Sequence, residues 1–278
     1  MYKSFCFLIL ILFCSFRLTA QETNPEVSGN EHVLQGLFLK LHQAATDEGK
    51  DSINGNILKL MNQTLLKSGS FSWPFDSLKT LGKLTSSDNQ VRLYTWNIPF
   101  SDNTYKYFGF IQYFSSRQKK YLIYPLIDKS AEITNPEYAP LTNNRWFGSL
   151  YYEIIPVKYK SDRYYTLLAL DYNNLFTSKK IVDVLYFDKS DFPHFGAAIF
   201  QVNNQLKDRI IFEFSARAIM TLHFDNDLKM ITFDHLSPAE SKYTGNYEYY
   251  GPDFSYDGLK FKKGRWSLVP DIPVRNAK

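Results

Sequence analysis

The fold is decided by two neighbouring stretches of the chain, RLYTWN at residues 92–97 and YFGFIQY at residues 107–113. Both repeat with a period of two, and both are rich in the aromatic and β-branched side chains that suit a pleated surface. The polar residues 101–104 between them are typical of a turn. Because such a connection is too short for a parallel crossover, the two stretches predict an antiparallel strand pair.

The same pattern continues almost to the end of the chain, with short polar turns between the apolar runs. The further strands that it predicts lie at residues 121–127, 150–159, 164–172, 180–187, 195–202, 209–214, 218–224 and 229–235. We therefore expect an antiparallel β-meander over residues 91–270, arranged as a curved sheet, a sandwich or a partly closed barrel.

Helical spacing precedes these strands. Apolar residues recur on one face of residues 31–45 and again of residues 52–67, with a break at Asp47-Glu48-Gly49 and a C-cap signal at Gly69. We predict an N-terminal helical hairpin at residues 31–68 that packs on the meander. The expected fold class is α+β, in one globular domain that covers residues 31–278.

The first residues have the layout of a secretory signal peptide. Lys3 gives a basic start, an unbroken apolar run extends from Phe5 to Phe16, and Ala20 supplies a small residue at the cleavage position. The run is too short to span a hydrocarbon core of about 30 Å as a stable helix. We predict a signal peptide at residues 1–20, with an uncleaved anchor as the alternative. A flexible lead-in is expected at residues 21–30.

Both cysteines, Cys6 and Cys14, lie inside the predicted signal peptide. The mature chain would then be cysteine-free, which excludes disulfides, cysteine-ligated metals and a cysteine nucleophile. The remaining chain of about 258 residues is long enough to bury a stable core without disulfides.

The charge balance bears on the class of partner. Loss of Lys3 and Arg17 lowers the formal net charge from +4 to +2. A chain this near neutrality is not expected to bind nucleic acid, because nucleic-acid binders carry concentrated basic surfaces. We interpret the one local excess as a solvated strand face, with a polyanion site as the alternative. That excess consists of Lys260, Lys262, Lys263 and Arg265.

The sequence contains none of the common enzyme motifs: no G-x-S-x-G elbow, H-E-x-x-H, phosphate loop or dinucleotide fingerprint. We predict no cofactor. A hydrolase that uses two carboxylates needs no local motif, because the fold brings its acids together. The aspartates in or beside predicted strands are Asp171, Asp183, Asp188, Asp191 and Asp234.

The string DFSYDG at residues 253–258 has two interpretations. Asp253, Ser255 and Asp257 have the spacing that opens a calcium loop, although Gly264 stands where a bidentate glutamate belongs. Asp257-Gly258 is also a strong signal for a type I′ hairpin turn. We predict the hairpin and no metal site, and keep calcium as the alternative.

Two regions could contact a ligand. The polar loop at residues 171–174 lies between strands, and residues 243–256 combine aromatic rings with hydrogen-bonding groups, as a sugar surface requires. The competing interpretations are Asx turns in the loop and a packed strand edge near the C-terminus. The ligand-binding candidates are Asp171, Asn173, Asn174, Asp234, His235, Tyr249, Tyr250, Asp253 and Tyr256.

Four phrases carry a likeness to known sequences: WPFDSL at residues 73–78, WFGSLYY at 146–152, FDHLSP at 233–238 and PDFSYDG at 252–258. In these phrases the chain resembles a family of uncharacterised exported proteins from Bacteroidota. The likeness extends over most of the mature chain, and it implies export and a single domain. It implies no activity and no catalytic residues.

Together these observations favour an exported, non-catalytic binding or interaction module of the periplasm or cell envelope, with an envelope protein or a glycan as its partner. No membrane-spanning segment is expected after signal cleavage. The alternative is a carboxylate-dependent hydrolase that acts on glycans. A pocket that holds two carboxylates would favour the hydrolase.

Overall fold

The computed structural model describes residues 24–273. The predicted signal peptide at residues 1–20 lies outside the described residues. So do residues 21–23 of the predicted lead-in and residues 274–278 at the end of the predicted domain.

The described chain begins with the predicted helical hairpin, formed by α1 (Pro25–Gln43) and α2 (Asp47–Leu65). The lead-in prediction is wrong from Pro25 onward, since the Asn24 side chain accepts hydrogen bonds from two amides of the first turn, at 3.1 Å each. The predicted break at residues 47–49 is wrong as well. Thr46 caps α2 by accepting from the Gly49 amide at 3.1 Å, so these residues form the first turn of α2.

The strands form three sheets in the described part of the chain. The first sheet has the order β1-β2-β3-β4 and comprises β1 (Gly82–Thr85), β2 (Val91–Pro99), β3 (Tyr105–Ser115) and β4 (Lys120–Ile127). The middle sheet has the order β5-β9-β8-β7-β6, and β12 also pairs with β8. It comprises β5 (Leu141–Thr142), β6 (Leu150–Tyr159), β7 (Asp162–Asp171), β8 (Thr177–Phe187), β9 (Pro193–Phe195) and β12 (Ile210–Ser215).

The last sheet has the order β11-β10-β16-β15-β14-β13. It comprises β10 (Phe200–Val202), β11 (Gln205–Lys207), β13 (Leu222–Asp225), β14 (Met230–Pro238), β15 (Tyr250–Lys262) and β16 (Arg265–Val269). β10 pairs with β16 in parallel, and the other pairs between these strands are antiparallel. The strand predicted at 195–202 is split between β9 and β10, which lie in different sheets.

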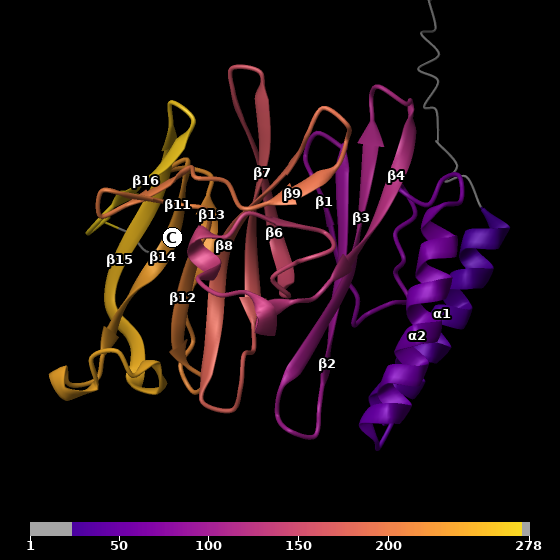
Figure 1. Cartoon of the computed structure of the whole chain (residues 1–278), viewed down its shortest axis with the longest axis horizontal. Coiled ribbons are helices and arrows are strands. Elements are labelled where there is room, and N and C mark those ends of the chain that lie inside the picture. Colours follow the sequence, from indigo (N-terminus) through magenta and orange to yellow (C-terminus); the bar gives the residue numbers. More distant parts are fainter. Residues whose placement is uncertain (1–23, 274–278) are drawn as a thin grey trace, which may run out of the picture.

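The helices and the three sheets stack largely in chain order, as Figure 1 shows from right to left, except that β12 returns to the middle sheet after β10 and β11. Three cores separate the layers: one between the helices and the first sheet, one between the first and middle sheets, and one between the middle and last sheets. The fold is α+β, as predicted, and its antiparallel sheets are packed face to face.

The period of two explains how a single strand serves two cores. In β7, Leu167 and Ala169 face the first sheet, whereas Leu168 faces the last sheet. Thr166 shares the side of Leu168, and its hydroxyl accepts a hydrogen bond from the indole of Trp266 at 2.9 Å. A one-residue slip of β7 would therefore exchange the two cores.

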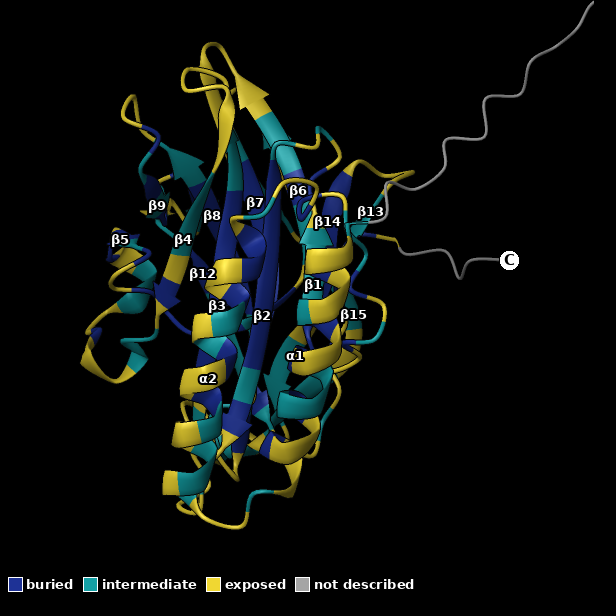
Figure 2. Cartoon of the chain, turned by 90° about the vertical axis from the view of Figure 1, so that its right-hand side faces the viewer, coloured by how far each residue is buried: buried dark blue, intermediate teal, exposed yellow. Residues whose placement is uncertain are grey.

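The helices cover the outer face of the first sheet, and their exposed sides point to solvent in Figure 2. The indole of Trp96 in β2 donates to the Asn54 side chain of α2 at 2.9 Å. The loop that follows α2 is held by the guanidinium of Arg92, which donates hydrogen bonds to the carbonyls of Phe71 and Trp73, at 2.6 Å each. The phrase at residues 73–78 is thus a structural connection.

The Asp257-Gly258 hairpin prediction is wrong. Both residues lie inside β15, where Gly258 pairs with Thr232 of β14 on one side and with Val269 of β16 on the other. The turn between β15 and β16 lies at Lys263 and Gly264, which have φ angles of 51° and 82°. Gly258 pairs on both edges and Asp257 pairs with Phe233 of β14, so both residues are held in the strand, and this pairing outweighs their local turn preference.

Candidate functional site

A cleft of about 970 Å³ opens where α2, the first sheet and one end of the middle sheet meet. Its walls are supplied by α2, the first half of β3, the end of β4 and the 3₁₀ turn η1 (Ser130–Glu132). The connection from β7 to β8 closes the far end. Three layers thus contribute to one concave site, which is where binding sites commonly form.

The side of the cleft next to α2 is apolar. Phe108 and Phe110 lie on the face of β3 that packs against the helices, and Leu58 of α2 faces the same space. Ile127, at the end of β4, is 42 % exposed and also lines the cleft. This wall can cover an extended apolar group.

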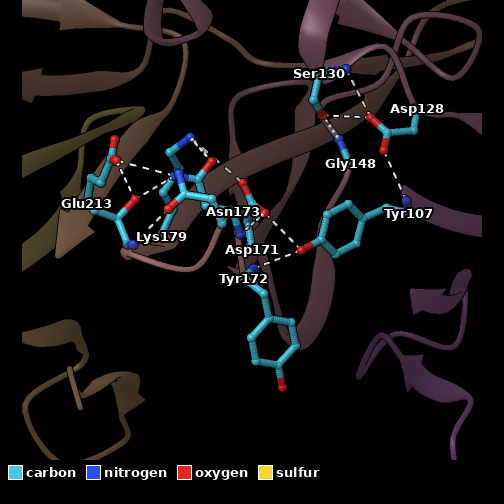
Figure 3. A network of polar contacts seen from close by, with 11 residues as sticks. Tyr107, Asp128, Ser130, Gly148, Asp171, Tyr172, Asn173, Lys179 and Glu213 are labelled. Carbon is cyan, nitrogen blue, oxygen red and sulfur yellow. Dashed lines mark hydrogen bonds and ion pairs between the residues drawn. The ribbon is translucent and has the colours of Figure 1, made fainter. Parts of the chain in front are cut away.

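The side next to the middle sheet is polar and is organised by Tyr107 (Figure 3). The Tyr107 hydroxyl donates to the Asp171 carboxylate at 2.8 Å and accepts from the Tyr172 amide at 2.8 Å. The backbone amide of Tyr107 donates to the Asp128 carboxylate at 3.0 Å. Two carboxylates therefore flank one tyrosine, at its phenol and at its backbone.

Asp171 ends β7 and orders the loop that follows it. Its carboxylate accepts from the Asn173 amide at 2.7 Å, an Asx turn that holds Asn173 at a φ of 51°. The ammonium group of Lys179, on β8, donates to the Asn173 side chain at 2.8 Å and lies 4.0 Å from the Asp171 carboxylate. Glu213 of β12 accepts from the Asn173 amide group at 3.3 Å.

Asp128 follows β4 and is fully engaged by its surroundings. It accepts from the amide and hydroxyl of Ser130, at 2.9 and 2.6 Å, and the Ser130 hydroxyl accepts from the Gly148 amide at 2.8 Å. A Cβ at Gly148 would lie 2.5 Å from the Asp128 carboxylate, so only glycine fits at that position. The sequence stretch at residues 146–152 thus supplies, through Gly148, a close contact with Asp128 beside the cleft.

Burial sets the electrostatics of the polar side. It raises the pKa of Asp171 above its usual value, because the charged carboxylate is poorly solvated, although hydrogen bonds from Asn173 and Tyr107 oppose the shift. The pKa of Tyr107 is also raised, first by burial and then by the adjacent carboxylate. A neutral phenol that donates to Asp171 is therefore the stable arrangement.

The charged side chains that line the cleft carry a small positive excess. They are Lys59, Lys106, Lys129 and Lys179 against Asp128, Glu132 and Asp171. Lys129 pairs with Glu132 at 2.6 Å, and Lys106 pairs with Asp51 outside the cleft at 3.6 Å. Lys59 forms no ion pair with any described residue.

Two of the ligand-binding candidates from the sequence, Asp171 and Asn173, line this cleft. Asn174 does not line it. Its side chain instead accepts from the amides of Phe176 and Thr177, at 2.8 and 3.0 Å, and so supports the turn into β8. The Asx-turn interpretation thus accounts for Asn174 completely, and for Asn173 in part.

The other candidates lie away from the cleft, in the last sheet or, for Tyr249, in the 3₁₀ turn that precedes β15. Buried Asp234 accepts from the Thr221 amide at 2.6 Å, which is a structural contact. His235 pairs with Asp257 at 2.8 Å, and this partner raises the pKa of His235. The pair borders a small apolar pocket of about 180 Å³ beside Phe233.

Two of the aromatic candidates near the C-terminus, Tyr249 and Tyr250, pack on neighbouring tyrosines. Tyr249 stacks on Tyr243 with ring centres 4.0 Å apart, and the Tyr250 hydroxyl accepts from the Gly245 amide at 3.0 Å. Tyr256 is half-buried in β15, opposite Asp234.

The three calcium candidates do not converge. Asp253 accepts from the amide and hydroxyl of Ser255, at 3.1 and 2.7 Å, whereas Asp257 turns to His235. Residues 24–273 contain no cluster of three His, Cys, Asp or Glu residues that could hold a metal ion.

The remaining carboxylates from the sequence serve structural contacts. Asp183 forms a fully buried ion pair with Arg209 at 3.1 Å, and Asp188 contacts His194 at 3.2 Å. Asp191 accepts from Ser115 at 2.7 Å and from Arg117 at 3.0 Å. Asp171 is the one aspartate of that set that lines the cleft.

Sequence reasoning missed Tyr107, Asp128 and Lys179. The sequence predicts a strand that contains Tyr107, but it does not show where that strand pairs with β4. In the structure Phe108 pairs with Ile127, the last residue of β4, so Tyr107 lies just past the end of that strand. Lys179 belongs to β8 and lies directly opposite Asp171 of β7 in the antiparallel pair that the two strands form. No local signal marks such residues, because their proximity arises from strand register.

Comparisons of this chain with protein-family models, with curated proteins and with solved structures found no match. Among the helices of residues 24–273, none combines the length and the apolar character needed to cross a membrane.

Proposed function

We propose that this protein is an exported, non-catalytic binding module of the cell envelope whose cleft takes a ligand with an apolar body and an acidic head. The amino-terminal pattern of Lys3, the apolar run and Ala20 supports export. The observation that carries the ligand proposal is the two-sided cleft, with aromatic residues toward α2 and a hydrogen-bonded charge network toward the middle sheet.

The apolar side favours a ligand with a hydrocarbon or aromatic body. Phe108, Leu58 and Ile127 present partly exposed carbon surface to the cleft. Covering such surface is favourable by about 25 cal/mol for each Å² removed from water. Sugars would leave this wall poorly matched, because their hydroxyls need many polar partners.

The polar side favours a ligand with an acidic head, because the groups there that still lack hydrogen-bond partners are donors. The carboxylates of Asp128 and Asp171 already accept bonds from protein groups. Lys179 uses one of its three protons on Asn173, and its contact with Asp171 is long, at 4.0 Å. A carboxylate or phosphate on the ligand could use the protons that remain.

One observation favours the second candidate, a carboxylate-dependent hydrolase: two carboxylates share the cleft, and one of them, Asp171, has a raised pKa. The Asp171→Asn variant distinguishes the candidates. A hydrolase loses turnover of chromogenic glycosides on this substitution, whereas a binding module shows no turnover in either form.

The direct test is a titration with a fluorescent long-chain fatty acid, alongside its methyl ester. We expect saturable binding of one acid per chain, and binding of the ester weaker by about tenfold, because the ester cannot pair with lysine. Equal affinity for the two probes would contradict the acidic head, and binding of neither would contradict the proposal as a whole.

A matched pair of variants locates the binding. Ile127→Asp places a charge on the apolar wall, and Leu206→Asp places one on β11, at a side chain that is similarly exposed, 37 % against 42 %. We expect Ile127→Asp to weaken binding of the acid by about tenfold or more and Leu206→Asp to leave it unchanged. Equal effects of both would place the ligand elsewhere.

A further inference from the structure

A second concave surface, independent of the cleft, lies where two hairpin tips meet. The tip between β6 and β7 carries Tyr159, and the tip between β15 and β16 carries Gly264; both tips lie at the upper edge of Figure 1. They are in contact, because a Cβ at Gly264 would lie only 2.5 Å from the Tyr159 ring. The contact joins the middle and last sheets at one end of the molecule.

This surface, named here the basic groove, has a volume of about 610 Å³. Residues that line it include Tyr159, Gln201, Lys262, Lys263, Arg265 and Ser267. Lys160 follows Tyr159 in sequence, and its ammonium lies 5.4 Å from the centre of the Tyr159 ring. Three exposed cations thus line the groove, and a fourth, Lys160, lies beside it.

These four cations lack acidic partners in the described part of the chain. Lys160, Lys262, Lys263 and Arg265 form no ion pair with any described residue. The tips contain a single carboxylate, that of Asp162, which accepts from the neighbouring Ser161 hydroxyl at 3.2 Å. The groove is therefore strongly positive, although the whole chain is nearly neutral.

The strand register between β15 and β16 places two of these positive charges opposite each other, which lowers the stability of the hairpin. Lys262 lies directly opposite Arg265 across the β15–β16 pair. Like charges at such positions repel and destabilise a hairpin. On the other tip, Lys158 lies opposite Arg163, but there Arg163 is neutralised by Asp88 at 3.1 Å. No acidic side chain among residues 24–273 pairs with Lys262 or Arg265, and a bound anion would relieve their repulsion.

We propose that the basic groove binds a small soluble ligand that carries two or more phosphate groups. Arginine offers a planar fork and lysine a point charge to phosphate oxygens, while Gln201 and Ser267 add neutral donors in the groove. Because the cations are divided between two hairpin tips, a ligand with more than one phosphate can pair with both tips. A flat membrane surface fits the concave shape poorly.

The test is calorimetric titration of the protein with inorganic tripolyphosphate at low salt, with vesicles of phosphatidylglycerol in a parallel arm. We expect tripolyphosphate to bind, more weakly as salt is raised, and the vesicles not to sediment the protein. Absence of tripolyphosphate binding, or binding to vesicles alone, overturns the proposal.

The double variant Lys262→Gln/Arg265→Gln should lower the affinity for tripolyphosphate by about tenfold or more. Its matched control, Lys40→Gln/Lys120→Gln, removes two exposed cations on α1 and β4 and should leave the affinity unchanged. Equal losses in both variants would show non-specific attraction and overturn the site. Because the groove variant relieves repulsion, its melting temperature should equal or exceed that of the unchanged protein, so a lost affinity cannot be ascribed to unfolding.

Discussion

The start of α1 and the middle of β15 each contain a glycine for which the sequence predicts a flexible segment or a turn. The structure places both glycines in regular elements. Gly29 lies in α1, where a Cβ would meet no atom within 4 Å. Gly258 lies in β15, where a Cβ would lie 2.8 Å from the sulfur of Met230. The first site has room for a larger side chain, whereas the second is crowded by its neighbours.

The two regions also differ in the kind of information that decides them. α1 begins through local contacts, since Asn24 caps amides only two and three residues away and Pro25 suits the first turn. β15 passes through Asp257-Gly258 because strands on both sides pair with it. Local chemistry controls the helix start, and tertiary pairing overrides local chemistry in the strand.

The largest expected effect is at the true turn beside that strand. Gly264→Ala should destabilise the protein by about 2 kcal/mol, because alanine resists a φ of 82° and its Cβ would press on Tyr159. Chemical denaturation gives the value. A loss no larger than that of Gly258→Ala would contradict the assignment of the turn.

Gly258→Ala should cost about 1 kcal/mol through contact with Met230 and the Ile231 carbonyl, which would lie 3.3 Å from the new Cβ. A double-mutant cycle separates contact from backbone strain. In a Met230→Ala background the glycine substitution should cost less than about 0.5 kcal/mol, since the sulfur is gone. The same cost in both backgrounds would restore a strained turn at this position.

Gly29→Ala should have the opposite sign. Alanine is favoured over glycine in a helix interior by about 0.8 kcal/mol, and the site has room for its Cβ. Thermal and denaturant unfolding should both show higher stability. No change in stability would mean that residues before Glu31 do not contribute a stable helix.

The smallest expected effect on stability comes from the ion pair between the Asp257 side chain and His235. The partner raises the pKa of His235 above its unfolded value, so the pair stabilises the fold fully below about pH 6.5 and loses its effect as pH rises through the folded pKa. His235 is half-exposed, and the contribution should stay below about 1 kcal/mol.

Unfolding at mildly acid and mildly alkaline pH, in the unchanged protein and in His235→Gln, isolates that contribution. The unchanged protein should lose more stability between the two conditions than the variant. An equal loss in both would show that the contact between His235 and Asp257 contributes nothing to the pH dependence.

Much of the fold was predictable because its signals are local. The alternating stretch at residues 92–97 became the interior of β2, and the apolar face of residues 31–45 became the buried face of α1. Periodicity reports which side chains share a face, and burial of that face is what stabilises the element. The sequence therefore determined the helical hairpin, most of the strands and the α+β class.

The site was predictable only in part. Asp171 and Asn173 stood out as polar residues at a strand end, and they do line the cleft. Tyr107 and Lys179 join them because the first and middle sheets stack at one register, which no short stretch of sequence specifies. The basic groove likewise depends on contact between Tyr159 and Gly264, more than one hundred positions apart in the chain.

The sequence alone thus determined the helical hairpin and most of the strands, since hydrophobic period, caps and turn residues act over a few positions. Only the tertiary structure decided which strands pair, where Asp257-Gly258 lies and which charges meet. The physical reason is that strand pairing and sheet packing join distant segments through burial and hydrogen bonding. Their combined free energy exceeds the local preference of about 1 kcal/mol that a two-residue turn signal provides.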